Sequence, residues 1–494
     1  MARWDVTLDF PLVLVTAWLN PKTGKVVTVA SYLNDHFDAD KERWTVLAEW
    51  DPVSGDISEK IITETKHGIF SPGTSMHEKG QVMFTGGTFM IGGGWSGGDV
   101  NASRDGEIYD PNDGRWTLLG KKISADSIRM SPGMCQPESK STDSACNKTE
   151  WQQHHPWLFA WKDGSVFHGG PSKQMNWFHL TKGSEKVEAA GRRLDDGDAV
   201  CGVAVMHDAV AGSIVTAGGA PNCHYWVDAG DHKKRGYRFP ATNVFGLTLG
   251  QPGQPVNPQK LAPMKHARIF SSAVILLTGE IFIVGGQTKG EGFYDDNCVL
   301  TPEIYNPTTN TWREANSHST PRVYHSWALL LPDSTVLVGG GGLNKNHEEA
   351  DHYGTQIYQP EYLLNAPRPK IVDGNLIGEY KLGSTKIPIQ TDMEVDTSAA
   401  SLIRYSAATD SLNNDLRRIP LKLTFVGKDA GGTKFGYAVD IPGDPGVALP
   451  GYWMLFVLSK KGGVPSVAKT SQSVVKRSKY KHGIVEMQSA ESVE

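Results

Sequence analysis

The sequence predicts an all-β protein in which a kelch-type β-propeller precedes a smaller immunoglobulin-like β-sandwich. One observation is a recurrent apolar segment that ends in small residues: VVTVASY (26–32), QVMFTGG (81–87), SVFHGG (165–170), SIVTAGG (213–219), IFIVGG (281–286) and TVLVGGGG (335–342). A second is a repeated strand and turn downstream, as in EIYDPNDGRW (107–116), EIYNPTTNTW (303–312) and QIYQPEYL (356–363). The 54 Gly and 28 Pro residues supply the tight turns that short strands need. A repeat of roughly 50 residues with this layout is typical of kelch blades.

The six recurrent segments predict six blades. We expect the ring to close by pairing of an N-terminal strand near 26–32 with the last blade. The propeller is predicted to span residues 1–365, up to the proline-containing linker LLNAPRPKIV (363–372).

Beyond the linker, short segments alternate between apolar and polar residues, which favours an immunoglobulin-like sandwich over residues 366–472. The segments are KIPIQTD (386–392), AASLIRYS (399–406), IPLKLTFVG (419–427), FGYAVDIP (435–442) and YWMLFVLS (452–459). Residues 473–494 have little hydrophobic content and are predicted to be a disordered tail.

Composition excludes several classes of partner. The net charge is −5, and basic residues cluster only in VKRSKYKH (475–482), so we expect no nucleic-acid partner. No run of 18 apolar residues occurs, so we expect no membrane span. The expected partner is a small-molecule substrate, bound by a monomer.

Tyr324 and His325 stand side by side in PRVYHSWALLLPD (321–333), at the start of a predicted strand. Neighbouring residues within a strand point to opposite faces, but at the lip of a strand, where the backbone turns, both side chains can face one central site. A phenolate oxygen and an imidazole nitrogen are good ligands for divalent copper. Taken alone, the segment is also compatible with a buried tyrosine and a hydrogen-bonded histidine.

From about residue 3 to about residue 472, the chain resembles the galactose oxidase family of copper radical oxidases. The segments that carry the resemblance are RWDVTLDFPL (3–12), ITETKHGIFSPGTSM (62–76), IGGGWSGG (91–98), PWLFAWKDGSVFHGGPSKQMNW (156–177), CGVAVMHDAV (201–210), TPEIYNP (301–307), SLIRYSAATDSLNNDLRRIPL (401–421) and GVALPGYWMLFV (446–457). The family has seven blades. Here QVMFTGG (81–87) runs almost directly into TFMIGGGWSGG (88–98), where the family has a whole blade between the glycine pairs.

In the family, copper is held by two Tyr and two His, and one Tyr is bonded to a Cys to form the radical cofactor. The resemblance assigns the Cys to Cys201, and the axial Tyr and first His to Tyr324 and His325. The cross-linked Tyr lies two residues before an Ala-Arg pair, where this chain has Lys265. The second His, on a hairpin that threads the propeller channel, corresponds to Asp410.

These replacements favour chemistry without a metal or other cofactor. Lys265 cannot form a phenoxyl radical, and its ammonium group repels a metal cation at neutral pH. We expect Lys265 and Asp410 to face the former metal position as a charge pair, and to form a catalytic acid–base cluster with Tyr324 and His325. The favoured function is dehydration, cyclisation or cycloaddition of an apolar small molecule, by a lyase or cyclase of small-molecule biosynthesis.

Two alternatives stay open. A copper oxidase of alcohols or aldehydes would use Tyr324, His325 and Asp410 as altered ligands and would need some other residue as the radical. A binding propeller would have no catalysis at all.

Further candidate residues surround this cluster in the predicted fold. Trp177 and Trp226 are predicted to lie in loops after glycine pairs, where they could form an apolar wall for the substrate. His266 and the pair His154–His155 are weaker candidates for proton transfer. Cys201 is expected to stay unpaired.

Two kinds of covalent modification are expected, because the family is secreted. Cys135 and Cys146 flank a short polar loop that a disulfide can close, and Asn101 and Asn147 begin glycosylation sequons. Cys223 and Cys298 are either free or joined to each other. The start MARWDVTLDF lacks a signal-peptide layout. Because the family is secreted, we expect a secreted or secretory-lumen glycoprotein whose leader has been removed.

Overall fold

The fold is described from a computed structural model, which covers residues 2–31, 45–62, 73–85, 107–110, 115–118, 157–171, 173–179, 186–193, 199–220, 240–290, 292–343, 348–364, 367–374 and 378–474. These residues form strands and three short 3₁₀ segments, η5 (Lys162–Gly164), η6 (Glu348–Ala350) and η7 (Glu361–Leu364). The predicted all-β class is confirmed. In the parts of the chain just given, no helix has the length and apolarity that crossing a bilayer requires.

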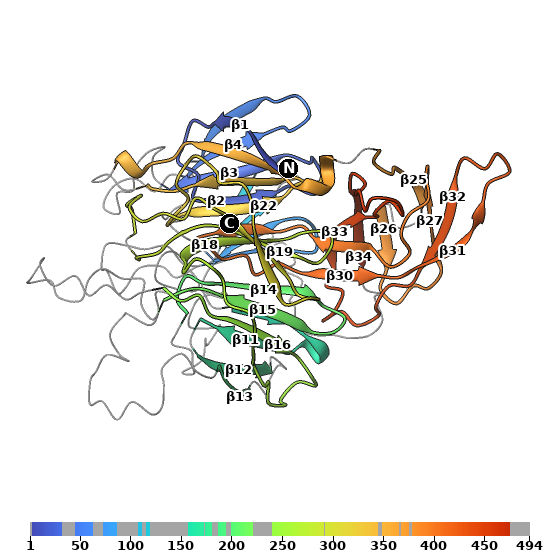
Figure 1. Cartoon of the computed structure of the whole chain (residues 1–494), viewed down its shortest axis with the longest axis horizontal. Coiled ribbons are helices and arrows are strands. Elements are labelled where there is room, and N and C mark those ends of the chain that lie inside the picture. Colours follow the sequence, from blue (N-terminus) through green and yellow to red (C-terminus); the bar gives the residue numbers. More distant parts are fainter. Residues whose placement is uncertain are drawn as a thin grey trace, which may run out of the picture.

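Among the described residues, six antiparallel sheets, here called blades, belong to the propeller (Figure 1). The first blade contains β2 (Thr16–Leu19), β3 (Val26–Ser31), β4 (Thr45–Trp50) and β5 (Ile57–Ile62), and the second contains β6 (Gly73–Met76), β7 (Val82–Thr85), β8 (Glu107–Asp110) and β9 (Arg115–Leu118). The next two contain β10 (Trp157–Ala160), β11 (Val166–Gly170), β12 (Gln174–His179) and β13 (Lys186–Arg192), and then β14 (Val203–Asp208), β15 (Ser213–Ala217), β16 (Val244–Thr248) and β17 (Gln259–Lys260). The last two contain β18 (Ile269–Ile275), β19 (Ile281–Gln287), β20 (Glu303–Asn306) and β21 (Thr311–Glu314), and then β22 (Ser326–Leu330), β23 (Val336–Gly340) and β24 (Gly354–Gln359) with β1 (Arg3–Asp9). Because 86–106 and 119–156 lie outside the described residues, the total of six stays a prediction.

The ring is closed by β1, which pairs antiparallel with β24 so that Arg3 lies opposite Gln359 and Asp9 opposite Gly354. The expectation that the strand near 26–32 closes the ring is wrong. Those residues form β3, an inner strand of the first blade, between β2 and β4. The apolar pattern of residues 26–32 is stronger than that of β1, because a closing strand only has to add one edge to a sheet that is already buried.

The recurrent glycine pairs link consecutive blades. Gly286 donates its N–H to the carbonyl of Arg322, which precedes the next blade, at 2.7 Å, and Gly219 donates to Arg268 O at the same distance. Gly285 has φ of 70°, and a Cβ there would lie 2.3 Å from Arg322 O. Only glycine allows this backbone approach, so the motif that revealed the repeat also holds neighbouring blades together.

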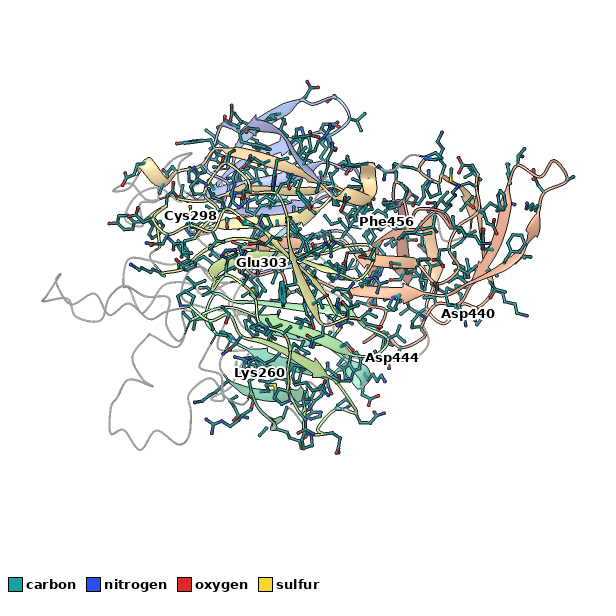
Figure 2. All side chains as sticks on the ribbon, viewed as in Figure 1. Lys260, Cys298, Glu303, Asp440, Asp444 and Phe456 are labelled. Atoms are coloured by element: carbon teal, nitrogen blue, oxygen red, sulfur yellow. The ribbon has the colours of Figure 1, made fainter. Side chains whose placement is uncertain are left out.

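The C-terminal part is a sandwich of two sheets, on the right in Figure 1. One contains β25 (Ile371–Gly374), β27 (Ile387–Thr391), β32 (Phe435–Val439) and β31 (Leu423–Lys428); the other contains β26 (Gly378–Lys381), β34 (Lys469–Val474), β33 (Gly451–Phe456), β28 (Ala400–Arg404) and β30 (Arg418–Leu421). Figure 2 shows Asp440 and Phe456 in this part, and Cys298 and Glu303 among the blades.

Several expectations fall outside the described residues. They concern the Cys135–Cys146 disulfide, the glycans at Asn101 and Asn147, the state of Cys223, the junction at 87–91 and the tail from 475 onward. Residues 473 and 474 belong to β34, so the sandwich extends slightly past its predicted end. Cys298 has a free thiol.

Candidate active site

Tyr324 and His325 lie just before β22, with their rings stacked at a centroid separation of 4.0 Å and an interplanar angle of 29°. Sequence neighbours can stack this way because the φ of His325 is 67°, a left-handed conformation that interrupts the alternation of a strand. The structure therefore brings the two side chains to the same side of the chain.

The imidazole of His325 is completely buried, with one ring nitrogen bonded to a carbonyl and the other close to a carboxylate. Nδ1 donates a hydrogen bond to the carbonyl of Gly342 at 2.5 Å, and Nε2 lies 3.7 Å from the Asp410 carboxylate oxygen Oδ1. With the proton on Nδ1, a neutral His325 turns the lone pair of Nε2 toward Asp410. Two electron-pair donors that face each other repel unless a cation or a proton lies between them.

Asp410 reaches this position on a tight hairpin between β29 (Ala407–Thr409) and the return strand. The backbones of Thr409 and Leu412 exchange hydrogen bonds of 3.0 and 2.7 Å. Asp410 and Ser411, the two central residues, have φ of 44° and 69°. Positive φ at both centres is the pattern of a type I′ turn, which Asp tolerates better than most residues.

The hairpin enters the propeller from the sandwich. β29 adds to the first blade, with Thr409 opposite Thr16 and their hydroxyls 3.0 Å apart. The return strand bonds to β14 of another blade, since Met206 N donates to Leu416 O at 3.2 Å. One short segment thus connects two blades and carries its only acidic tip residue, Asp410, to His325.

Aromatic rings surround the stacked pair. Phe293 packs edge-on against Tyr324 at 4.9 Å and against His325 at 5.5 Å, and Phe270 packs edge-on against Tyr324 at 5.3 Å. Cys201 is half-buried and packs with Tyr324 against the small cluster that includes Phe270. A substrate group beside Tyr324 would therefore meet an apolar wall.

Unusual backbone conformations gather at this place. Cys201, Phe270, Phe293, His325 and Asp410 all have φ between 44° and 67°. Each such residue costs on the order of 1–3 kcal/mol and persists only where its surroundings hold it, which is frequent at functional sites. The concentration of these conformations around Tyr324 marks this part of the propeller as the candidate active site.

Lys265 does not belong to this cluster, so the expected Lys265–Asp410 charge pair is wrong. Its Nζ lies 2.7 Å from Glu314 Oε2, with 64% of the Lys side chain exposed. His266 Nε2 bonds the other Glu314 oxygen at 2.9 Å. Both backbone N–H groups of these residues donate to Glu303, which holds the segment with its side chains toward solvent.

Trp177 is fully buried in β12, where its indole N–H donates to Gln254 O at 2.8 Å. It packs against Phe167 as part of the core, so its predicted role as a substrate wall is wrong. Trp226, His154 and His155 lie outside the described residues.

Sequence reasoning missed Arg322, which lies two residues before Tyr324. Its guanidinium is buried and donates through Nη1 to Gly340 O at 2.8 Å. Burial lowers the pKa of Arg322 to about 9, with partial compensation by the charge of Asp295. A signal existed, because the segments HARIF and PRVYH place Arg268 and Arg322 alike before consecutive blades. Phe270 and Phe293 carried no comparable signal.

The residues fit part of the family's copper site. A histidine that ligates a metal through Nε2 usually donates its other N–H to a carbonyl or carboxylate, as His325 does to Gly342. Within the described segments no group of three His, Cys, Asp or Glu side chains gathers, so the donors would be Tyr324, His325 and Asp410. The radical cofactor does not fit, because the position of its Tyr is held by the outward-facing Lys265.

Comparisons with known proteins agree with the fold. The family description "Galactose oxidase-like, Early set domain" matches residues 368–472, and "Glyoxal oxidase N-terminus" matches 211–364. A galactose oxidase of Gibberella zeae is 39% identical over 95% of this chain and 70% of its own length. An aldehyde oxidase, GLOX1 of Arabidopsis thaliana, is 31% identical over 44% of this chain and 37% of its own length.

A solved structure of a fungal alcohol oxidase of the AA5 family, in complex with copper, superimposes with a TM-score of 0.76 at 33% identity. The superposition covers 96% of this chain and 99% of that one. The copper is a property of that protein. Together with the identity over almost the whole chain, the match confirms the resemblance and the immunoglobulin-like C-terminal domain.

Proposed function

The chain belongs to the galactose oxidase family, and from that premise we propose that it is a copper-dependent enzyme that acts on a small alcohol or aldehyde through altered ligands. Tyr324, His325 and Asp410 are the proposed ligands. The observation that carries this proposal is the buried Nε2 of His325, which faces the Asp410 carboxylate at 3.7 Å. The copper-bound structure of the related fungal alcohol oxidase supports it more than the metal-free interpretation.

Each residue has a defined task in this proposal. Gly342 O holds the proton of His325 on Nδ1 and so keeps Nε2 available as a donor. Asp410 supplies a buried negative charge that a cation stabilises. Tyr324, whose ring stacks on that of His325, would supply a phenol oxygen as the third ligand. Bound copper would polarise the substrate oxygen and accept one electron. Oxidation of an alcohol to an aldehyde releases two electrons, so a residue other than Lys265 would have to accept the second, and dioxygen would take up both electrons as hydrogen peroxide.

A second candidate function rests on the replacement of the cofactor Tyr by Lys265. Without that Tyr, Tyr324 and His325 would work as proton donor and acceptor in dehydration, cyclisation or cycloaddition of an apolar molecule. The apolar wall of Phe270 and Phe293 supports such a substrate. The acid–base cluster is smaller than the sequence led us to expect, since Lys265 lies elsewhere.

Copper titration of the purified protein tests the first proposal. We expect about one equivalent of Cu²⁺ by mass spectrometry, with an electron paramagnetic resonance signal that disappears in Asp410→Asn and His325→Gln. His318→Gln is the matched control, because His318 is also buried and also bonds a backbone carbonyl through Nδ1, that of Thr320 at 2.7 Å. Equal loss of copper in the control, or no binding by the unaltered protein, would reject the proposed metal site.

Turnover separates the two candidates. Peroxide production from a panel of primary alcohols and aldehydes, abolished by a chelator, supports the oxidase. If turnover of an apolar substrate survives the chelator but falls at least tenfold in Tyr324→Phe, the acid–base function is the better account.

We also propose that the protein is a secreted, monomeric glycoprotein. The sequons at Asn101 and Asn147 and the Cys135–Cys146 spacing support secretion. Intact-mass measurement after expression in a eukaryotic secretory host, with and without glycosidase and reductant, checks the glycans and the disulfide, and the mass under native conditions checks the monomeric state. Unmodified asparagines together with two free thiols would reject them.

A further inference from the structure

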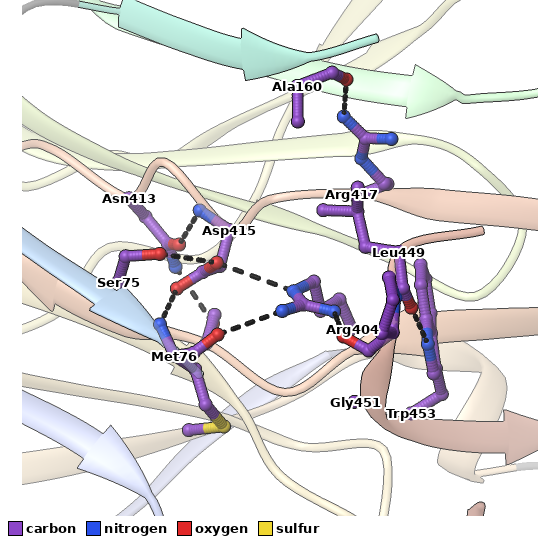
Figure 3. A network of polar contacts seen from close by, with 12 residues as sticks. Ser75, Met76, Ala160, Arg404, Asn413, Asp415, Arg417, Leu449, Gly451 and Trp453 are labelled. Atoms are coloured by element: carbon purple, nitrogen blue, oxygen red, sulfur yellow. Dashed lines mark hydrogen bonds and ion pairs between the residues drawn. The ribbon is translucent and has the colours of Figure 1, made fainter. Parts of the chain in front are cut away.

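The hairpin that carries Asp410 is anchored by a buried carboxylate five positions further along, Asp415. Its Oδ2 accepts a hydrogen bond from the backbone N–H of Met76 at 2.8 Å, and Oδ1 lies 3.4 Å from both Ser75 Oγ and Arg404 Nε. Met76 ends β6 in the second blade, so one side chain joins the hairpin to the propeller wall (Figure 3).

Arg404, the last residue of β28, completes the connection from the sandwich. Nη2 donates to Met76 O at 2.9 Å and Nη1 donates to Pro450 O at 3.0 Å. Asp415 therefore accepts from the N–H of Met76, and Arg404 donates to the carbonyl of the same residue (Figure 3). Together the two side chains satisfy the backbone of Met76 as a neighbouring strand would. The guanidinium also lies over the ring of Trp453 at 5.7 Å.

Both partners are almost completely buried, with side-chain exposures of 5% for Arg404 and 4% for Asp415. Burial raises the pKa of Asp415, while Arg404 and the N–H of Met76 oppose that rise. A buried pair of this kind adds little net stability compared with apolar residues, but removing one partner leaves the other charge uncompensated. Such pairs are best explained by the geometry they specify.

We propose that Asp415 and Arg404 are positioning residues that hold the tip of the hairpin so that Asp410 faces His325. This inference rests on the proposed function, because the position of Asp410 matters only if the site is used. The inference goes beyond the proposed function because it assigns a role to two residues that are not among the proposed ligands.

Other contacts keep the hairpin folded when this pair is lost. Arg417 donates to the carbonyl of Ala160 at 2.5 Å (Figure 3). It also donates to the carbonyl of Gly446 at 2.5 Å, and Thr409 bonds Thr16 at the other side. Replacing Asp415 is therefore expected to loosen the tip rather than unfold the domain.

The test compares Asp415→Asn and Arg404→Gln by hydrogen exchange and copper affinity. In Asp415→Asn the one amide oxygen can accept from Met76 N–H or from Arg404 Nε but not from both, so an amide N–H faces the other donor and the charge pair is lost. We expect the amides of Thr409 and Leu412 to exchange at least tenfold faster, since a hydrogen bond to a charged group is worth on the order of tenfold or more in equilibrium. Copper dissociation constants should rise about 10–100-fold, as for other residues that orient metal ligands.

Tyr437→Phe is the matched control, because it also leaves a buried N–H without its acceptor: Tyr437 Oη accepts from Val395 N at 3.0 Å in the other sheet of the sandwich. The control should leave exchange at Thr409 and Leu412 unchanged. The inference is overturned if exchange there is unchanged in both variants, if the control accelerates it equally, or if exchange accelerates while copper affinity stays constant. Absence of copper binding by the unaltered protein rejects the proposed metal site, and the exchange rates then decide the anchoring role alone.

Discussion

Gln356→Glu should stabilise the protein, because it gives the buried Arg322 a carboxylate partner. The corresponding arginine of the preceding blade, Arg268, already has such a partner in Glu303. In the preceding blade Arg268 donates through Nη1 to Gly285 O at 2.8 Å, and through Nε and Nη2 to Glu303 at 3.1 and 2.8 Å. Arg322 repeats the first contact with Gly340 O, also at 2.8 Å, but its Nε and Nη2 have no hydrogen-bond acceptor among the described residues.

The register of the strands places Gln356 where Glu303 stands. Glu303 lies opposite Ile283, two residues before Gly285, and Gln356 lies opposite Val338, two residues before Gly340. The Gln356 side chain is buried, and its amide donates to Ser319 Oγ at 2.9 Å. A carboxylate at this position would replace an amide with an acceptor that carries the charge opposite to that of Arg322.

The size of the effect follows from the pKa of Arg322, which burial lowers from 12.5 to about 9. At roughly 1.4 kcal/mol per pKa unit, this corresponds to about 5 kcal/mol by which burial disfavours the charged form. A new carboxylate also loses its own hydration, so we expect only the ~1.5–3 kcal/mol of a charge-assisted hydrogen bond. The opposite change in the preceding blade, Glu303→Gln, should destabilise by roughly 3–5 kcal/mol.

Unfolding midpoints at one fixed scan rate compare the two variants with the unaltered protein. Interaction with Arg322 lowers the pKa of the new carboxyl in the folded state, so its contribution is present above about pH 4.3 and is lost as pH falls through the lowered value. An unchanged or lowered midpoint for Gln356→Glu at neutral pH would contradict the reasoning. It would mean that Asp295, whose charge already acts on Arg322, compensates the guanidinium sufficiently.

Three further predictions concern single side chains. Burial lowers the pKa of His168 and of His318 from 6.5 to about 4, so both stay neutral when folded while the unfolded chain takes up protons. Stability should therefore be full above pH 6.5 and fall toward pH 4, and His168→Gln should reduce that slope in denaturation midpoints measured across this range. Trp177→Phe should lower stability by about 1–3 kcal/mol, through loss of a buried hydrogen bond, with unchanged turnover; altered substrate preference would restore its role as a wall. Lys265→Ala removes only an exposed pair with Glu314, so the unfolding midpoint and copper binding should hardly change. Loss of copper in that variant would place Lys265 at the site after all.

The sequence was sufficient for the all-β class and for the blade repeat, because their signals are local; it was not sufficient for the strand that closes the ring. A glycine is required where one blade meets the backbone of the next, as at Gly285, so glycine pairs recur in most of the repeats and can be seen in the sequence. The adjacency of Tyr324 and His325 likewise pointed to a turn at the strand's edge, and the positive φ of His325 is that turn.

Side-chain direction could not be predicted in the same way. An ungapped match places Lys265 in the sequence position of the cofactor Tyr, but its direction depends on Glu314 and Glu303, which are 49 and 38 residues further along the chain. Trp177 was assigned to a loop because it follows a glycine pair, yet it lies in β12 and faces the core. The direction of a side chain depends on which residues, distant in the sequence, lie next to it in the fold, and spacing along the chain does not contain that information.

The hairpin at the propeller axis also determines when the site can exist during synthesis. Thr409, beside the tip residue Asp410, bonds Thr16, which the ribosome adds 393 residues earlier. At about 5–20 residues per second, the first blade waits roughly 20–80 s for the axial segment that pairs with β2. Until then the inner edge of β2 has no strand beside it, and the nascent protein presents an incomplete centre to chaperones and to any metal present. Assembly of the site is therefore coupled to completion of the chain.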